Sequence, residues 1–92
     1  MRIALQKFGT TLTSRQAGSE AYKALQLQLR DTSQDERFEI DFSGVLTLSP
    51  SWADEFLTPL RELYWERLIL LPSDNLSVQA TLHLLKEIHK WN

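Results

Sequence analysis

The residues IDFSGVLTLSPSWADEF, numbers 40–56, decide the fold that this sequence predicts. They alternate between apolar and polar side chains up to Phe42, turn at Ser43-Gly44, and then reach Ser49-Pro50-Ser51. A serine followed by proline is typical of a helix start, because serine caps the first turn and proline lacks an N–H that this position does not need. Backbone N–H groups gather at such a start with partial positive charge. We therefore predict a strand, a turn and a helix, and we expect any discrete functional site at this strand-to-helix junction.

The chain that follows the junction continues the helix. Its apolar residues recur with the helical period, and they are Ala53, Phe56, Leu57, Leu60, Leu63 and Tyr64. Pro59 lies inside this pattern and its ring clashes with the carbonyl of Glu55, which predicts a kink or a break there. Residues 68–71 are apolar on both faces and predict a central strand covered on both sides. We expect the helix to pack on that strand through Phe56, Leu60 and Leu63.

The chain before the junction predicts a strand over residues 3–9, a short extension or second strand over 10–12, and a helix from a Thr13-Ser14 cap to about residue 30. The apolar stripe of this helix recurs every four residues, as Ala17, Ala21, Leu25 and Leu29. Gly18 weakens the helix or allows another backbone to approach closely. After a polar loop at 31–36, residues 37–42 alternate like a strand with one wetter face.

The end of the chain predicts a turn and cap at residues 72–75 and a last helix to about residue 90. The side chains expected to face the core are Val78, Leu82, Leu85, Ile88 and Trp91. Strands that alternate with helices predict an α/β fold with a largely parallel sheet and about three α-helices.

Size and composition limit the function classes. Ninety-two residues with 42% apolar side chains fit a single domain over 1–92. Cysteine is absent, which excludes disulfides and cysteine-zinc sites. The N-terminus has no long apolar segment and the longest apolar run is 68–71, so we expect a cytoplasmic bacterial protein. The net charge is −2 with scattered basic residues, which argues against nucleic acid or membranes as partners and favours a protein.

The motif DFSGV, followed by SPSWADEF, resembles the STAS-like domain family, small bacterial relatives of the anti-sigma-factor antagonists. FGTTLTSRQA near the start and an apolar closing helix support the resemblance, which covers roughly residues 7–88. It implies a mixed sheet with helices packed on it, and a partner akin to an anti-sigma-factor kinase, a histidine-kinase-type ATPase. It also implies that Asp54 positions the loop through a backbone hydrogen bond.

Ser49 and Ser51 have two readings. The resemblance implies a phosphorylation switch, in which a phosphate would add charge at a partner-facing helix start. However, the family pattern places Pro50 at the phospho-acceptor position, with Ser49 where the antagonists have aspartate and Ser51 one place after it. We favour helix capping for these serines, including a capping-box arrangement of Ser51 with Asp54.

The other polar residues do not indicate a catalytic or metal site. Asp54 and Glu55 are adjacent on a helix and point about 100° apart, so they do not converge as a catalytic pair. His83 and His89 are six residues apart and face opposite sides, unlike metal-binding pairs, and we expect them at the surface or its boundary. For Arg15 we favour an ion pair with Asp41 over contact with an acidic partner.

The sequence therefore predicts a non-enzymatic regulatory or interaction module without cofactor or metal. We expect it to bind a protein partner, such as an anti-sigma-factor-like kinase or ATPase, through the junction at residues 48–55. The candidate contact residues are Ser49, Ser51, Trp52, Asp54 and Glu55; Trp52 either packs inside or anchors the interface, depending on its exposure. Two alternatives remain: a small-ligand sensor that holds a nucleotide or anion at the same helix start, and an enzyme that uses Asp54, Glu55 or a histidine.

Overall fold

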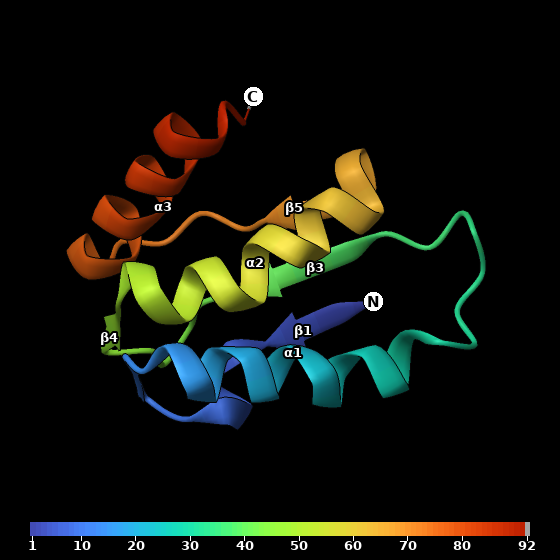
Figure 1. Ribbon diagram of the computed structural model, residues 1–92, viewed down its shortest axis with the longest axis horizontal. Coiled ribbons are helices and arrows are strands. Elements are labelled where there is room, and N and C mark those ends of the chain that lie inside the picture. The colour runs from blue at the N-terminus through green and yellow to red at the C-terminus, as the bar shows by residue number, and fades with distance from the viewer. Residues whose placement is uncertain (92) are drawn as a thin grey trace.

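Strands and helices alternate along the chain in the structure, a computed structural model that describes residues 1–91 (Figure 1). The elements in order are β1 (Arg2–Ala4), the 3-10 helix η1 (Leu5–Phe8), β2 (Thr11–Leu12), α1 (Arg15–Leu29), β3 (Phe38–Asp41), β4 (Thr47–Leu48), α2 (Pro50–Tyr64), the 3-10 turn η2 (Trp65–Arg67), β5 (Leu68–Leu70) and α3 (Leu76–His89). The predicted α/β class with three α-helices and parallel strands is confirmed.

The strands form two parallel sheets. The larger has the order β1-β3-β5, and the smaller pairs β2 with β4. The prediction that residues 68–71 form the central strand is wrong, because β3 is central and β5 lies at an edge. Both α1 and α2 lie on the same side of the larger sheet (Figure 1). Ile69 and Leu71 remain half-buried. The apolar residues of this strand therefore do not show that both of its faces are covered by other elements.

One face of the larger sheet and the inner sides of the helices make the core. Phe38, Ile40 and Phe56 are fully buried, as is Leu60, which confirms the expected packing of α2 on the sheet. Leu63 is 56% exposed, so its predicted core position is wrong. It lies in the last turn of α2, one residue before that helix ends.

Two more predicted core positions differ at helix ends. Ala17 of the α1 stripe is exposed, and Ile88 of α3 is 59% exposed. Each lies in a terminal turn of its helix, and Ala17 points about 100° away from Gly18, which packs on α2. The central positions of the same stripes, Leu25 and Leu85, are buried as predicted.

Helix α2 continues through Pro59. It runs unbroken from Pro50 to Tyr64 with Pro59 inside it, so the predicted break is wrong. The ribbon in Figure 1 keeps its helical turns beyond this point, while its C-terminal half rises away from the line of its first half. Burial of Phe56 and Leu60 on either side of Pro59 stabilises the helix on the sheet despite the missing N–H donor.

Helices α1 and α2 approach each other closely at Gly18. A Cβ atom placed on Gly18 would lie 2.4 Å from the carbonyl oxygen of Trp52. The absence of a side chain therefore lets the two backbones pack directly, as one of the two readings of Gly18 predicted. Next to this contact, the ring of Trp52 stacks on Phe56 at 4.8 Å, and Phe8 lies edge-on to Phe56 at 5.3 Å.

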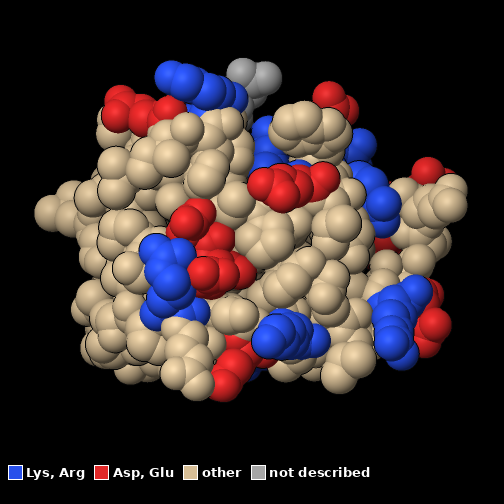
Figure 2. All heavy atoms as spheres, viewed as in Figure 1, with Lys and Arg blue, Asp and Glu red and all other residues tan. Residues whose placement is uncertain are grey.

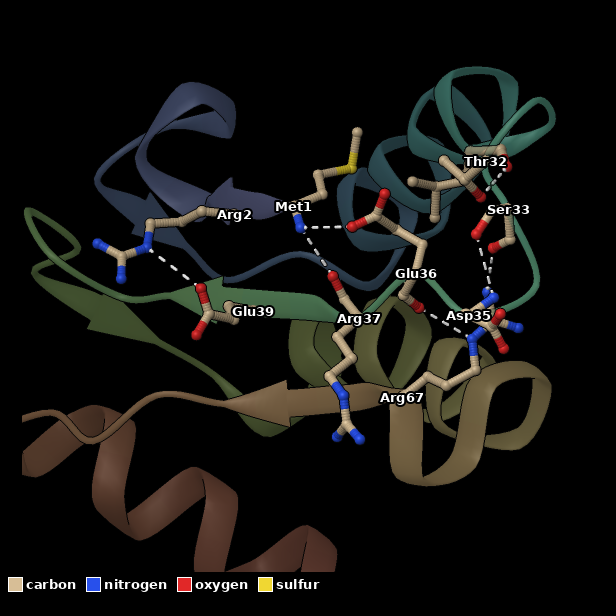
Figure 3. A network of polar contacts seen from close by, with 10 residues as sticks. Met1, Arg2, Thr32, Ser33, Asp35, Glu36, Arg37, Glu39 and Arg67 are labelled. Carbon is tan, nitrogen blue, oxygen red and sulfur yellow. Dashed lines mark hydrogen bonds and ion pairs between the residues drawn. The ribbon is translucent and has the colours of Figure 1, made fainter.

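Arg67 holds the polar loop between α1 and β3 against the end of α2 (Figure 3). Its Nε donates to the carbonyl of Glu36 at 2.9 Å, and a terminal nitrogen donates to the carbonyl of Ser33 at 3.0 Å. The guanidinium also lies over the rings of Phe38 and Tyr64, at 5.5 and 5.2 Å from their centroids. One side chain thus connects the loop, the central strand and the C-terminal part of α2.

The surface drawn in Figure 2 carries basic and acidic side chains in small, interleaved groups, without a stripe of one sign. Within residues 1–91, no helix has both the length and the apolar character needed to cross a membrane.

Candidate functional site

All three α-helices begin at the same end of the molecule, on the left in Figure 1, where the parallel strands end. Each start is capped by a side-chain oxygen that accepts from a backbone N–H three residues later: Ser14 from Ala17, Ser49 from Trp52 and Asn75 from Val78. In open α/β sheets, the carboxyl ends of the strands are the usual place for binding. The predicted junction at 48–55 lies at this end.

Ser49 is fixed at the junction by three hydrogen bonds. Its N–H donates to the carbonyl of Leu12, its hydroxyl donates to the carbonyl of Thr13 at 2.7 Å, and the same oxygen accepts from the N–H of Trp52 at 3.2 Å. Ser49 is therefore the helix cap, with Pro50 in the first turn, and the predicted capping by one of the two serines is confirmed. The hydroxyl also ties the cap to the segment that leads from β2 into α1.

Ser51 does not cap α2, so the expected capping box with Asp54 is wrong. The cap on Trp52 comes from Ser49, and the N–H of Ala53 donates to the carbonyl of Ser49. Pro50 has no N–H. The start of α2 therefore leaves mainly the N–H of Ser51 for an outside acceptor, whereas a phosphate at a helix start uses several such groups. This geometry gives little support to the ligand-sensor alternative at the junction.

Trp52 is a core residue. Its side chain is 1% exposed and its ring stacks on Phe56. A direct contact between Trp52 and a partner, which was one of the two predicted readings, is therefore wrong for this folded state. Leu48 is buried as well. The part of the junction that reaches solvent consists of Pro50, which is exposed, and the half-buried Ser49, Ser51, Asp54 and Glu55.

Asp54 joins the three helices through side-chain contacts. Its Oδ1 accepts from the hydroxyl of Thr58 at 2.7 Å and lies 2.8 Å from Nε2 of His89 on α3, while its Oδ2 lies 3.6 Å from Arg15 on α1. Asp54 makes these contacts in place of the loop-positioning backbone bond that the resemblance implied. Since the ionised carboxylate only accepts, Nε2 of His89 carries the proton.

Arg15 pairs with the acidic residues of α2 and not with Asp41, so the predicted partner is wrong. Its guanidinium donates to Glu55 at 3.0 Å and reaches Asp54. Asp41 instead accepts from the N–H of Ser43 in the turn that follows β3. The prediction failed because it paired Arg15 with a strand-end carboxylate, whereas the close packing of α1 on α2 brings the helix carboxylates nearer.

The pKa values of this cluster follow from these contacts. Burial alone would raise the pKa of Asp54, but hydrogen bonds from Thr58, His89 and Arg15 outweigh that effect and lower it. The hydrogen bond to Glu55 raises the pKa of Arg15. Asp54 is therefore ionised at neutral pH. Among the contacts of residues 1–91, no hydroxyl lies on the second ring nitrogen of His89, so the arrangement connects helices and lacks the nucleophile-base-carboxylate order of a hydrolase.

The histidines have separate environments, as their spacing predicted. His83 is exposed and pairs with Glu87 one turn later. His89 is partly buried, contacts Asp54, and stacks on Trp91 at 5.5 Å between ring centroids. Its pairing with Asp54 joins residues 35 positions apart, which no local pattern in the sequence could have indicated. No group of three or more metal-binding side chains is found within residues 1–91.

Two exposed leucines beside the junction were missed by the sequence analysis. Leu46 is 67% exposed and Leu76 is 79% exposed. The segments that carry them are linked, because the side chain of Asn75, which precedes Leu76, donates to the carbonyls of Val45 and Leu46 at 2.9 and 3.0 Å. In the sequence, Leu46 belongs to a short apolar segment and Leu76 follows a helix cap. Neither pattern indicates that the side chain is exposed to solvent. Leu46 directly precedes β4, and Leu76 is the first residue of α3.

Comparisons of this chain with protein-family models, with characterised proteins and with solved structures found no match.

Proposed function

We propose that this chain is a non-enzymatic regulatory or interaction module that binds a protein partner at the end where its helices begin. The contact surface would consist of Leu46, Leu76, Pro50, Ser51 and Glu55. The observation that carries the proposal is the pair of highly exposed leucines, Leu46 and Leu76, on two segments that the side chain of Asn75 links. Adjacent exposed apolar side chains with polar neighbours are typical of protein interaction sites.

The class of partner rests on the resemblance of residues 40–56 to the anti-sigma-factor antagonists. We propose a histidine-kinase-type ATPase of the anti-sigma-factor class, and STAS-like regulation in the bacterial cytoplasm. Pro50 stands at the usual phospho-acceptor position, and the hydroxyl of Ser49 is already used within the domain. We therefore propose a constitutive contact that needs no phosphorylation.

The test is a binding titration of the purified chain with each such ATPase encoded in the same genome. We expect Leu46→Asp, and separately Ser51→Glu, to weaken binding at least about tenfold, which corresponds to about 1.4 kcal/mol. Leu27→Asp is the matched control, because Leu27 is 66% exposed on the C-terminal half of α1, away from the junction.

Circular dichroism and thermal melts would verify that each variant stays folded. Undiminished affinity in both junction variants, or an equal loss in Leu27→Asp, would contradict the proposed surface. Failure of every ATPase to bind the wild-type chain would contradict the proposed class of partner.

A further inference from the structure

Among residues 1–91, no strand pairs with the outer edge of β5. In the parallel pair with β3, the N–H of Leu71 donates to the carbonyl of Ile40, which is the register partner of Leu70. Alternate residues of a strand point their backbone groups to the same neighbour, so Ile69 and Leu71 face β3 while Leu68 and Leu70 face outward. The N–H of Leu68 donates to the carbonyl of Trp65. The outward groups are then the carbonyl of Leu68 and both backbone groups of Leu70.

Helix α3 makes hydrogen bonds to the backbone at the edge of the smaller sheet, but none to the outer edge of β5 among residues 1–91. Its Ser77 and Thr81 hydroxyls bind the backbone of Leu48 in β4, at 3.0 Å to the N–H and 2.6 Å to the carbonyl. Among the described residues, no hydrogen bond from α3 reaches residues 68–70. The contrast shows that α3 covers the edge of the smaller sheet and leaves the β5 edge available.

A groove runs between β5 and α3 along this edge. One hollow of about 250 Å³ is lined by Arg61, residues 68–70, Lys86 and Trp91. A second, of about 420 Å³, continues past Leu70 along residues 71–73 to the side chains of α3, including Val78 and Leu82. The two hollows share Leu70 and Lys86, so they lie next to each other along β5, and both polar and apolar surface lines them.

The groove carries positive charge. Neither hollow is lined by an acidic side chain, and both contain Lys86, for which no ion-pair partner is found within residues 1–91. Nε of Arg61 is buried and has no hydrogen-bond partner in the described part of the chain. A terminal nitrogen of the same guanidinium donates to the carbonyl of Trp65 at 3.2 Å, which holds the group in place. Arg61 also lines the smaller hollow, so its guanidinium adds a second positive charge beside Lys86.

We propose that this groove binds an extended acidic peptide segment of another protein, which adds as a strand to β5. The backbone of the peptide pairs with the carbonyl of Leu68 and with the N–H and carbonyl of Leu70. A carboxylate of the peptide accepts from Arg61 and Lys86. This mode combines main-chain hydrogen bonds for affinity with side-chain pockets for specificity. It uses a surface separate from the Leu46–Leu76 surface and does not depend on the function proposed above.

Lys86 and Arg61 could have a different role, which is to prevent the β5 edge from pairing with other copies of the chain. Proteins often blunt edge strands with lysine, proline and short strand length, and β5 is short and followed by Pro72. If Lys86 and Arg61 serve only that role, their removal causes self-association of the chain and no peptide binds. The two roles therefore give opposite results with the wild-type protein.

The probe is a fluorescein-labelled peptide, Thr-Val-Glu-Val-Glu-Val-amide, titrated into the purified chain and followed by fluorescence anisotropy. We expect saturable binding, and at least about tenfold weaker binding of the same peptide with lysine in place of both glutamates. We expect a similar loss for Lys86→Glu and for Arg61→Gln. The control is Lys23→Glu, an exposed lysine that lines a different hollow on α1, and it should leave the affinity unchanged.

A second measurement reports on the strand pairing itself. The amide of Leu70 should exchange with solvent at least about tenfold more slowly when the glutamate peptide is bound, because it becomes hydrogen-bonded. The peptide N-methylated at each valine should lose both the affinity and this protection. Equal binding of the glutamate and lysine peptides would overturn the proposal. So would an effect of Lys86→Glu no larger than that of Lys23→Glu, an unchanged Leu70 amide, or self-association of Lys86→Glu without wild-type peptide binding.

Discussion

At the scale of single residues, Gly18 has the most direct structural consequence. The close approach of its α-carbon to the carbonyl of Trp52 leaves no room for a side chain. We expect Gly18→Ala to lower the free energy of unfolding by about 1–3 kcal/mol, since α1 and α2 must separate to accept the methyl group. Helix propensity alone predicts the opposite sign, a gain of about 1 kcal/mol. Urea denaturation measures the difference.

The control for Gly18 is Gln16→Ala, an exposed position on the same helix, which should change stability by less than about 0.5 kcal/mol. A stabilised Gly18→Ala protein would mean that the two helices do not pack backbone to backbone in solution.

Ser49 and Ser51 form a matched pair, because they are chemically identical and two residues apart. Ser49 caps α2 and also donates to Thr13, whereas no side-chain hydrogen bond of Ser51 is found within residues 1–91. We expect Ser49→Ala to cost about 1–2 kcal/mol of unfolding free energy and Ser51→Ala less than about 0.5 kcal/mol. Chemical denaturation of both variants tests this. Equal losses would contradict the assignment of Ser49 as the cap.

At the scale of elements, α2 shows how packing can outweigh local preference. It continues through Pro59 without the hydrogen bond that an N–H at position 59 would donate to the carbonyl of Glu55. The buried residues Phe56 and Leu60 hold both halves of the helix to the core. The burial of this face therefore stabilises a continuous helix at a position where the sequence alone predicted a kink or a break.

Replacing this proline should stabilise the protein. We expect Pro59→Ala to raise the free energy of unfolding by about 1 kcal/mol or more, because alanine restores the N–H and has the highest helix propensity. The measurement is a denaturant titration, with Pro50→Ala as the control, since proline in the first turn lacks only an N–H that is unpaired there in any case. Destabilisation by Pro59→Ala would indicate that the ring itself fills a necessary space.

At the scale of the whole molecule, one carboxylate connects all three helices. Asp54 on α2 contacts Arg15 at the start of α1 and His89 at the end of α3. The exposed fraction of its side chain is 33%, so solvent screens these contacts in part. The cluster therefore holds the arrangement of helices with a modest free energy that depends on the ionisation of Asp54.

The pH dependence of stability follows from the lowered pKa of Asp54. A group with a lower pKa in the folded state contributes stability above its unfolded pKa of about 3.9, and that stability is lost as pH falls through the folded value. We expect Asp54→Asn to be less stable than wild type at pH 5–7, by about 1 kcal/mol or less, with the difference shrinking below about pH 4. Urea denaturation across this range provides the measurement.

Asp31→Asn, which removes an exposed carboxylate, is the control for charge alone. A difference between wild type and Asp54→Asn that stays constant from pH 7 to pH 2 would contradict the role of the ionised carboxylate.

The sequence by itself determined the three α-helices, their starts and the strands β3 and β5, but it predicted a strand where the 3-10 helix Leu5–Phe8 lies. Serine and asparagine oxygens define the caps at Ser14, Ser49 and Asn75, and the 3.6-residue period marks the buried faces of the helices. These features depend on residues three or four positions apart, so local chemistry is sufficient to predict them. The alternation of strands and helices then predicted the α/β class and the parallel strands.

The tertiary structure alone decided which elements are neighbours and which side chains remain exposed. Leu68–Leu70 reads as a central strand but lies at an edge, because strand order depends on chain connections and not on the apolar pattern of one segment. Arg15 pairs with Glu55, and His89 contacts Asp54, across 35 or more positions of the chain. The burial of Trp52 depends on how the helices pack. Contacts over such separations form only when the whole chain folds, and no local pattern encodes them.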